Sequence, residues 1–353
     1  MYPQLLIVFI ITFALAFSLM PFFIRLAKKF KFLDRPSERK IHAHAMPTMG
    51  GVVIFLVFIA GISLSRRLNP EFDWLFSDYF LSLFVGGTVI LLLGIFHDIL
   101  DMQPEAKLMG QIIAGLIVFI NGIRIEAVTN PFGGQLYLPQ WLSMVITVGW
   151  VVAIINAVNL IDGLDGLAGG ITVVSSAVLF FIALTKKEIS SLFIIAALVG
   201  SILGFLRYNF YPAKIFMGDA GSMFLGFILS IISILGINKM AAAVALLVPI
   251  TALGIPIYDT TLAVFRRLVM KRNVMSSDRK HLHYRLLDMG LNQRQVVLFM
   301  YAVGIYFGLI SYLLARIPIE YSLPLLILFS MGVFLGIKAI GFIERKTRTL
   351  HQR

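Results

Sequence analysis

The chain contains no cysteine among its 353 residues, which excludes disulfide bonds, thiolate catalysis and metal sites with cysteine ligands. Charged residues are also scarce: they make up 14% of the sequence, against 59% hydrophobic residues. The mean hydropathy of +0.92 leaves too little polar surface for a soluble protein of this length. The sequence therefore predicts an integral membrane protein.

Long apolar segments recur along the chain, each roughly the 17–25 residues that a helix needs to cross a bilayer. A transmembrane β-barrel would instead show short segments of alternating polarity. We expect an all-α, polytopic membrane protein of about eleven helices (10–11), forming one domain over residues 1–353. The first segment has no basic residue before it and no cleavage site after it, so we expect a retained span. The expected helices cover residues 4–24, 49–64, 80–97, 107–121, 141–155, 167–184, 191–206, 221–236, 241–262, 296–315 and 321–342.

Basic residues are distributed unevenly between the gaps that separate these helices. The formal net charge is +12, and 22 of the 30 Lys and Arg residues fall in alternate gaps, the longest being 263–295. By the positive-inside rule these gaps face the cytoplasm, with the N-terminus outside and the C-terminus in the cytoplasm. This charge suits contact with anionic membrane lipid. No basic run is interleaved with aromatic residues, so we expect no nucleic-acid partner.

The strongest polar motif is NAVNLIDGLDGL, in which Asn156, Asn159, Asp162 and Asp165 follow one another at intervals of three. In a helix this spacing places the four side chains on neighbouring positions of one face. Amide and carboxylate oxygens suit a hard cation such as Mg²⁺ and the edges of a nucleotide. The alternative is a helix end with Asn and Asp as caps, but a cap needs only one such residue. The motif therefore favours a binding site.

Two further acids lie at the ends of spans on the same side of the membrane. Asp219, between two glycines in FMGDAGS, opens a helix where it either holds a metal ion or caps the helix. Asp98, which follows His97, is placed to bind a metal or accept a proton, or is simply solvated. Lys107, at the mouth of the next span, is either a phosphate ligand or an interfacial anchor.

Histidine and basic residues form two more motifs in the predicted cytoplasmic loops. In DRKHLHYR, His281, His283 and Arg285 alternate, so in an extended loop they project to one side and suit a diphosphate. An ordinary basic loop explains the arginine but not the paired histidines. In RKIHAHAMPTMGG, Lys40 and His42 precede a glycine pair, which suits either phosphate contact or a helix-entry turn.

Together these motifs bring acids, amides and cationic groups to one face of the membrane. That combination suits Mg²⁺-assisted phosphoryl chemistry, in which acids hold the ion and cations offset developing charge. Because a soluble reaction would not need so many spans, we expect one soluble and one lipid phosphate as substrates.

The chain resembles the polyprenyl-phosphate N-acetylhexosamine-1-phosphate transferases, through RKIHAHAMPTMGG, NAVNLIDGLDGL, FMGDAGS and HLHYRLLDMGL in family order. It looks most like the branch that transfers GlcNAc-1-phosphate from UDP-GlcNAc to undecaprenyl phosphate and releases UMP. The resemblance implies Mg²⁺ as cofactor, with Mn²⁺ as a substitute. It also implies a homodimer in the bacterial inner (cytoplasmic) membrane, with the active site built from cytoplasmic loops. The sequence does not identify the cell-envelope glycan that the lipid product feeds.

The resemblance also assigns roles to the acids. Asp162 and Asp165 lie in the family's acidic nucleotide and catalytic motif, with the two asparagines beside them, and Asp219 matches the aspartate associated with Mg²⁺. Asp98 matches the second of the family's paired aspartates, as general base or metal support. This chain has His97 where the family usually has the first, which challenges any mechanism that needs both acids.

The remaining assignments concern the substrate pocket. Asn209 and Phe216 match positions that line the uridine pocket in the family. His281 and His283 match the histidine motif associated with the sugar-nucleotide diphosphate, although Tyr284 stands where the family often has another histidine.

Two rival functions are compatible with the same motifs. A UDP-MurNAc-pentapeptide transferase would share the fold and most of the acids, but the LLDMGL that follows the histidines looks more like the GlcNAc branch. A secondary transporter would have polar residues and broken helices at the bilayer midplane. Here the acids lie at one face, except Asp259 after Pro256.

Overall fold

The computed structural model describes residues 3–34, 44–68, 79–100, 102–129, 135–238 and 282–317, with isolated residues from 254 to 332. Almost all of this is helix, as the sequence predicts. The helices are α1 Pro3–Phe30, α2 Gly50–Leu68, α4 Tyr79–Leu81, α5 Gly87–Leu100, α6 Pro104–Ile120, α7 Gln140–Ile161, α8 Leu167–Lys186, α9 Ile189–Asn209, α10 Gly218–Asn238, α13 Leu282–Asp288 and α14 Gln293–Leu314, with a π-helical stretch at Ser82–Gly86 joining α4 to α5. The strands are β1 Leu33–Asp34, β2 Met46–Pro47, β3 Ala127–Thr129 and β4 Gln135–Tyr137.

Eight helices in this described part of the chain are long and apolar enough to cross a membrane. They match eight of the expected spans, and α6, with 17 residues, matches the ninth at 107–121. The expected span at 241–262 and most of 321–342 lie outside the described residues. A multi-pass helical membrane protein is therefore confirmed, while the total of eleven spans and the sidedness of the termini stay predictions.

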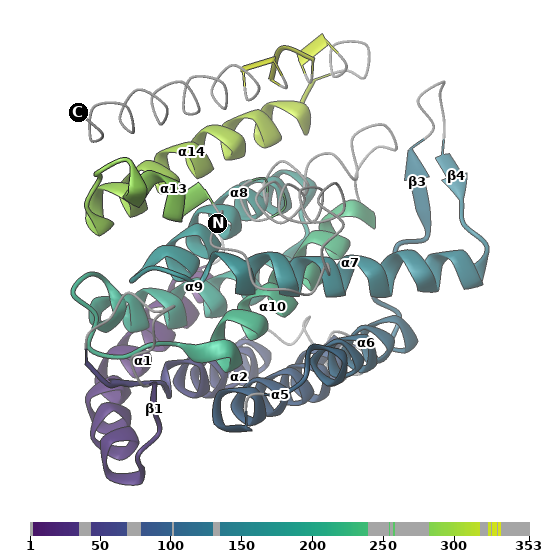
Figure 1. Ribbon diagram of the computed structural model, residues 1–353. Coiled ribbons are helices and arrows are strands. Elements are labelled where there is room, and N and C mark those ends of the chain that lie inside the picture. The colour runs from purple at the N-terminus through teal and green to yellow at the C-terminus, as the bar shows by residue number, and fades with distance from the viewer. Residues whose placement is uncertain are drawn as a thin grey trace.

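Helix α10 is the most buried of the candidate spans and packs against α2, α5, α7 and α8 (Figure 1). Small residues permit this close contact, because a side chain at Gly94 of α5 would overlap the backbone of Ala220 in α10. A side chain at Gly226 would likewise strike the backbone of Ile155 in α7. These contacts hold the first turn of α10 close to the ends of α5 and α7 that are predicted to face the cytoplasm.

Helices α1 and α9 form another close pair, built on two glycines four residues apart. A side chain at Gly200 would overlap the Thr12 side chain, and one at Gly204 would crowd Ala16. Such a row of small residues lets two helix backbones pack closely, which matters in a membrane because the hydrophobic effect does not drive helices together there.

The start of α2 is joined to the start of α10 by backbone hydrogen bonds. Phe216 N donates to Pro47 O at 2.8 Å, Gly50 N donates to Phe216 O at 3.0 Å, and Gly51 N donates to Met217 O at 3.0 Å. Strand β1 pairs with β2 beside this junction, and the β3–β4 pair lies at the other end of the bundle (Figure 1). Loops at the β1 end therefore converge around the first turn of α10.

Candidate active site

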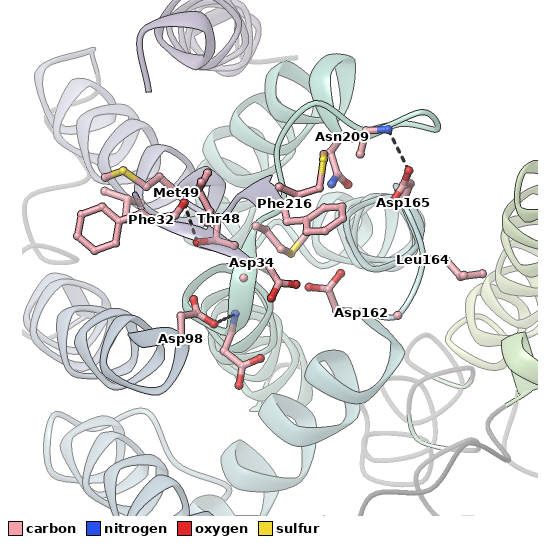
Figure 2. A pocket seen from close by; sticks show the side chains of 18 of the residues that line it. Phe32, Asp34, Thr48, Met49, Asp98, Asp162, Leu164, Asp165, Asn209 and Phe216 are labelled. Carbon is pink, nitrogen blue, oxygen red and sulfur yellow. Dashed lines mark hydrogen bonds between the residues drawn. The ribbon is translucent and has the colours of Figure 1, made fainter. Parts of the chain in front are cut away.

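A cavity of about 1300 Å³ opens at the β1 end of the bundle (Figure 2). Its wall is formed by the ends of α1 and α5, the turn between α7 and α8, and the loop before α10. Figure 2 shows Phe32 and Met49 on one side and Asp162 and Asp165 on the other, so the lining changes from apolar to acidic. Six residues predicted from the sequence line this one cavity: Asp98, Asp162, Asp165, Asn209, Phe216 and Asp219.

The helix carrying the Asn/Asp motif ends earlier than its three-residue spacing suggests. Helix α7 stops at Ile161, Asp162 is its C-terminal cap, and Gly166 has a φ of +80° just before α8. The expectation that all four polar residues share one helical face is therefore wrong beyond Asn159. Asp162 points into the cavity, whereas Asp165 turns toward the next loop, where its Oδ2 accepts a hydrogen bond from Ala213 N at 2.9 Å (Figure 2). The turn thus sends the two acids in different directions.

Asp219 is the centre of a compact polar network between three helices. Lys107 Nζ, from α6, donates to Asp219 Oδ2 at 2.5 Å and to Asn159 Oδ1 at 2.8 Å. Asn159 Nδ2, from α7, donates to Asp219 Oδ1 at 3.1 Å and to Ser222 Oγ at 2.8 Å. The ammonium group of Lys107 therefore bridges Asp219 and Asn159, two residues of the predicted site, which the alternative of an interfacial anchor does not explain.

His97 and Asp98, on the last turn of α5, also contact Asp219. His97 Nε2 lies 3.3 Å from Asp219 Oδ2, and Asp98 Oδ1 accepts a hydrogen bond from Asp219 N at 3.0 Å. Gly218, with a φ of +66°, leaves room for the Asp98 carboxylate, which a side chain there would strike. The His-Asp pair therefore supports both the backbone and the side chain of Asp219.

Asn156 lies deeper in the bundle, where it pairs with a residue that the sequence analysis missed. Its Nδ2 donates to Gln111 Oε1 at 2.6 Å, and Gln111 Nε2 lies 3.5 Å from Asn156 Oδ1. Gln111 is buried and stands one helical turn after Lys107 on α6. The sequence does contain a signal for Gln111: a glutamine four residues after a lysine, in an otherwise apolar helix, is a polar residue that needs a partner.

Asn209 and Phe216 hold the loops that frame the cavity. Asn209 Oδ1 accepts from Gly166 N at 3.0 Å, and its Nδ2 donates to Ile215 O at 2.9 Å, so its amide ties two loops together. Tyr301 of α14, also missed from sequence, donates its hydroxyl to Gly166 O at 2.6 Å. The wall of the cavity is thus fixed by contacts between segments far apart in sequence.

The histidine motif is only partly described. His283, Tyr284 and Arg285 belong to the helix α13, so the expected extended geometry is wrong there, since alternate residues of a helix face different sides. His283 is fully buried, and a side chain at Gly163 would overlap its Nε2 and crowd the Tyr284 hydroxyl. Helix α13 therefore lies directly against the Asp162 turn. Lys40, His42 and His281 lie outside the described residues.

Asp162 lies close to the other carboxylates of the site. Burial, and then the nearby carboxylates of Asp219, Asp98 and Asp165, raise the pKa of Asp162 well above its usual range. No group of three or more His, Asp or Glu side chains within the described ranges is arranged to hold a metal ion. Mg²⁺, however, commonly uses one or two carboxylates together with waters and substrate phosphates, so this donor set fits it.

Comparison with known proteins agrees with the resemblance found in the motifs. Residues 80–237 match the family described as glycosyl transferase family 4. The chain is 35% identical over 345 residues, covering 97% of it and 94% of the relative, to a probable undecaprenyl-phosphate N-acetylglucosaminyl 1-phosphate transferase of Bacillus subtilis. It is 34% identical over 285 residues to an undecaprenyl-phosphate alpha-N-acetylglucosaminyl 1-phosphate transferase of Thermotoga maritima, covering 81% of the chain and 82% of the relative.

A relative with a different named substrate also matches. The chain is 30% identical over 329 residues to a phospho-N-acetylmuramoyl-pentapeptide-transferase of Shouchella clausii, covering 87% of the chain and 96% of the relative. The match to the Bacillus subtilis protein nevertheless spans almost the full length of both chains. The chain therefore belongs to glycosyl transferase family 4 and is a phosphotransferase of the membrane.

Proposed function

We propose that the protein transfers GlcNAc-1-phosphate from UDP-GlcNAc to undecaprenyl phosphate and releases UMP. The observation that carries this proposal is the Lys107–Asp219 network beside the acid-lined cavity, in a chain similar over its whole length to a relative named for GlcNAc-1-phosphate transfer. The apolar part of the lining, which includes Phe32, Met49 and Ile95, suits the first isoprene units of a lipid phosphate.

The acids at the cavity are suited to hold Mg²⁺, with Mn²⁺ as a substitute. Asp219 and Asp98, both in the lining, would hold the ion, which when bound offsets the charge of the diphosphate. Lys107 supplies a further positive charge for the phosphate oxygens. Asp98, exposed at the cavity, is placed to orient the lipid phosphate or take its proton.

In this mechanism an oxygen of the lipid phosphate attacks the β-phosphorus of UDP-GlcNAc, and the bond to the UMP oxygen breaks. Asp165 and Asn209 keep the two framing loops in place, so the nucleotide meets a preformed wall. The buried His283 of α13 packs against Gly163 and so supports the Asp162 turn.

Two features of the setting belong to the same proposal. We place the enzyme in the bacterial inner membrane with the cavity facing the cytoplasm, because Lys31, Asp98 and Asp162, from three gaps predicted to face the cytoplasm, line the cavity. We also propose a homodimer, which chemical cross-linking of the purified protein in detergent would detect as a doubled mass.

The alternative substrate is UDP-MurNAc-pentapeptide, which the similarity to the Shouchella clausii relative favours. The transporter alternative is not retained, because the relatives are named transferases.

The test is UMP release by purified protein with undecaprenyl phosphate and Mg²⁺, comparing UDP-GlcNAc, UDP-GalNAc and UDP-MurNAc-pentapeptide. We expect release with UDP-GlcNAc alone, and a loss of about 10²–10³-fold in Asp219→Asn, since a catalytic electrostatic contact is removed. Release only with UDP-MurNAc-pentapeptide would select the alternative. Normal turnover by a folded Asp219→Asn protein would remove the metal assignment.

A further inference from the structure

Lys107 occupies the place on Asp219 where a bound cation would be expected. Its ammonium group donates to Asp219 Oδ2 at 2.5 Å, and its side chain is only 14% exposed. The same Oδ2 atom is approached by His97 Nε2 at 3.3 Å, while Asn159 donates to Oδ1. Both carboxylate oxygens of Asp219 are therefore engaged by donors from other helices.

A carboxylate offers about four lone-pair sites; Lys107 and His97 approach Oδ2 of Asp219, and Asn159 approaches Oδ1. A divalent ion that binds through Oδ2 therefore has to displace Lys107 or His97. A lysine ammonium and a divalent cation on one carboxylate also repel each other strongly at this partly buried site. Lysine is suited to leave, because its charge sits at the end of a flexible four-carbon stem with three rotatable donors. Asn159 can remain, since its contact is to the other oxygen and it is fixed separately by Ser222.

We propose that Lys107 and the divalent cation exchange at Asp219. In the cation-free enzyme Lys107 neutralises Asp219 and keeps the site assembled; when the ion binds, the ammonium group leaves Asp219 and turns to the phosphate oxygens of the substrate. This inference rests on the proposed cation requirement and adds to it a lysine that competes with the cation for Asp219 and is released by it.

The exchange predicts how cation affinity responds to loss of the lysine charge. Mn²⁺ binding to substrate-free protein in detergent is measured by electron paramagnetic resonance in wild type and in Lys107→Met, which keeps length but removes the charge. We expect the Mn²⁺ Kd to fall about tenfold in Lys107→Met, the scale of one charge-assisted hydrogen bond. Lys107→Arg, which keeps the charge, should bind no more tightly than wild type.

The matched control is Lys214→Met, which removes an exposed lysine from the loop before α10 and should leave the Kd unchanged. An equal fall in Lys214→Met would show a general charge effect and overturn the exchange. An unchanged or weaker Mn²⁺ affinity in folded Lys107→Met would overturn it as well.

A second measurement needs no variant. Reductive dimethylation of wild-type lysines, followed by mass spectrometry, should modify Lys107 slowly without ion and several-fold faster with Mn²⁺, with Lys214 as internal reference. Equal Lys107 rates would overturn the exchange. If wild type releases UMP with Mg²⁺ but shows no exchange, only this inference fails; if it binds no Mn²⁺ at all, the cation part of the proposed function fails too.

Discussion

Gln111 is a buried amide in an apolar helix, and its only described side-chain partners are Asn156 and Met223. A polar group at such a position is costly unless it is hydrogen-bonded, so the Gln111–Asn156 pair is under strong geometric constraint. Since Gln111 and Lys107 are one turn apart on α6, fixing Gln111 also fixes the direction from which Lys107 reaches Asp219.

Replacing Gln111 with Leu should destabilise the protein by about 1–3 kcal/mol, because the partly buried Asn156 amide loses its side-chain partner and keeps only its hydrogen bond to Val152 O. We also expect slower UMP release, since Asn156 and Asn159 share the last turns of α7. Thermal unfolding in detergent and the release assay measure the two effects. Gln140→Leu, at an exposed position at the start of α7, is the matched control and should change neither. A Gln111→Leu protein as stable as wild type would show that the pair is dispensable.

The residues of the site could be predicted from sequence where their chemistry is local. Asp98, Asp162 and Asp219 stand out because acids at the ends of apolar helices need a reason, and the cavity brings all three together. Gln111 and Tyr301 could not be identified this way, because their partners come from other helices and only packing brings them close. The roles assigned to the site residues stay predictions until activity is measured.

At the scale of elements, the contact between α5 and α10 positions the acids. Gly94 lies one turn before Asp98, and a side chain there would overlap the backbone of Ala220, the residue after Asp219. The distance between the two acids is therefore set by how closely these helices approach.

Gly94→Ala should push α5 away from α10, since overpacking of a close contact typically costs about 1–3 kcal/mol. The shift would break the hydrogen bond from Asp219 N to Asp98 and lower the rate of UMP release more than it lowers substrate binding. Melting temperature and kcat against KM are the readouts. Gly149→Ala on α7 is the control, because a side chain there meets nothing within 4 Å. Equal behaviour of both variants would contradict this account of the interface.

Helix positions could be predicted from hydropathy more reliably than helix ends. The expected span at 167–184 corresponds to α8. The span expected at 141–155 ends before α7 does, whereas the three-residue spacing of the Asn/Asp motif implied a helical face that reaches Asp165, beyond the end of α7 at Ile161. The left-handed Gly166 breaks that periodicity, and glycine alone does not reveal its φ. The same limit applies to α13. The alternation of His281, His283 and Arg285 suggested an extended chain, but the segment is helical where His283 packs against Gly163.

At the scale of the whole molecule, the candidate site lies at one end of the described bundle. The cavity, the β1–β2 pair and the loop before α10 share that end, and the β3–β4 pair lies at the other. Lys31 and Asp98, from two gaps predicted to face the cytoplasm, line the cavity, so the orientation of the protein in the membrane decides which compartment supplies the soluble substrate.

The absence of cysteine makes this orientation directly testable, because any introduced thiol is the only one. Tyr137→Cys places a thiol on β4, where the side chain is 78% exposed, and Lys214→Cys places one in the exposed loop before α10. A membrane-impermeant maleimide should label Tyr137→Cys in intact spheroplasts and Lys214→Cys only after permeabilisation. Labelling of Lys214→Cys in intact spheroplasts would place the cavity on the outer face, away from cytoplasmic UDP-sugars. The proposed donor would then be wrong even if the acids bind a cation, because a nucleotide-sugar transferase must open toward the compartment that holds its donor.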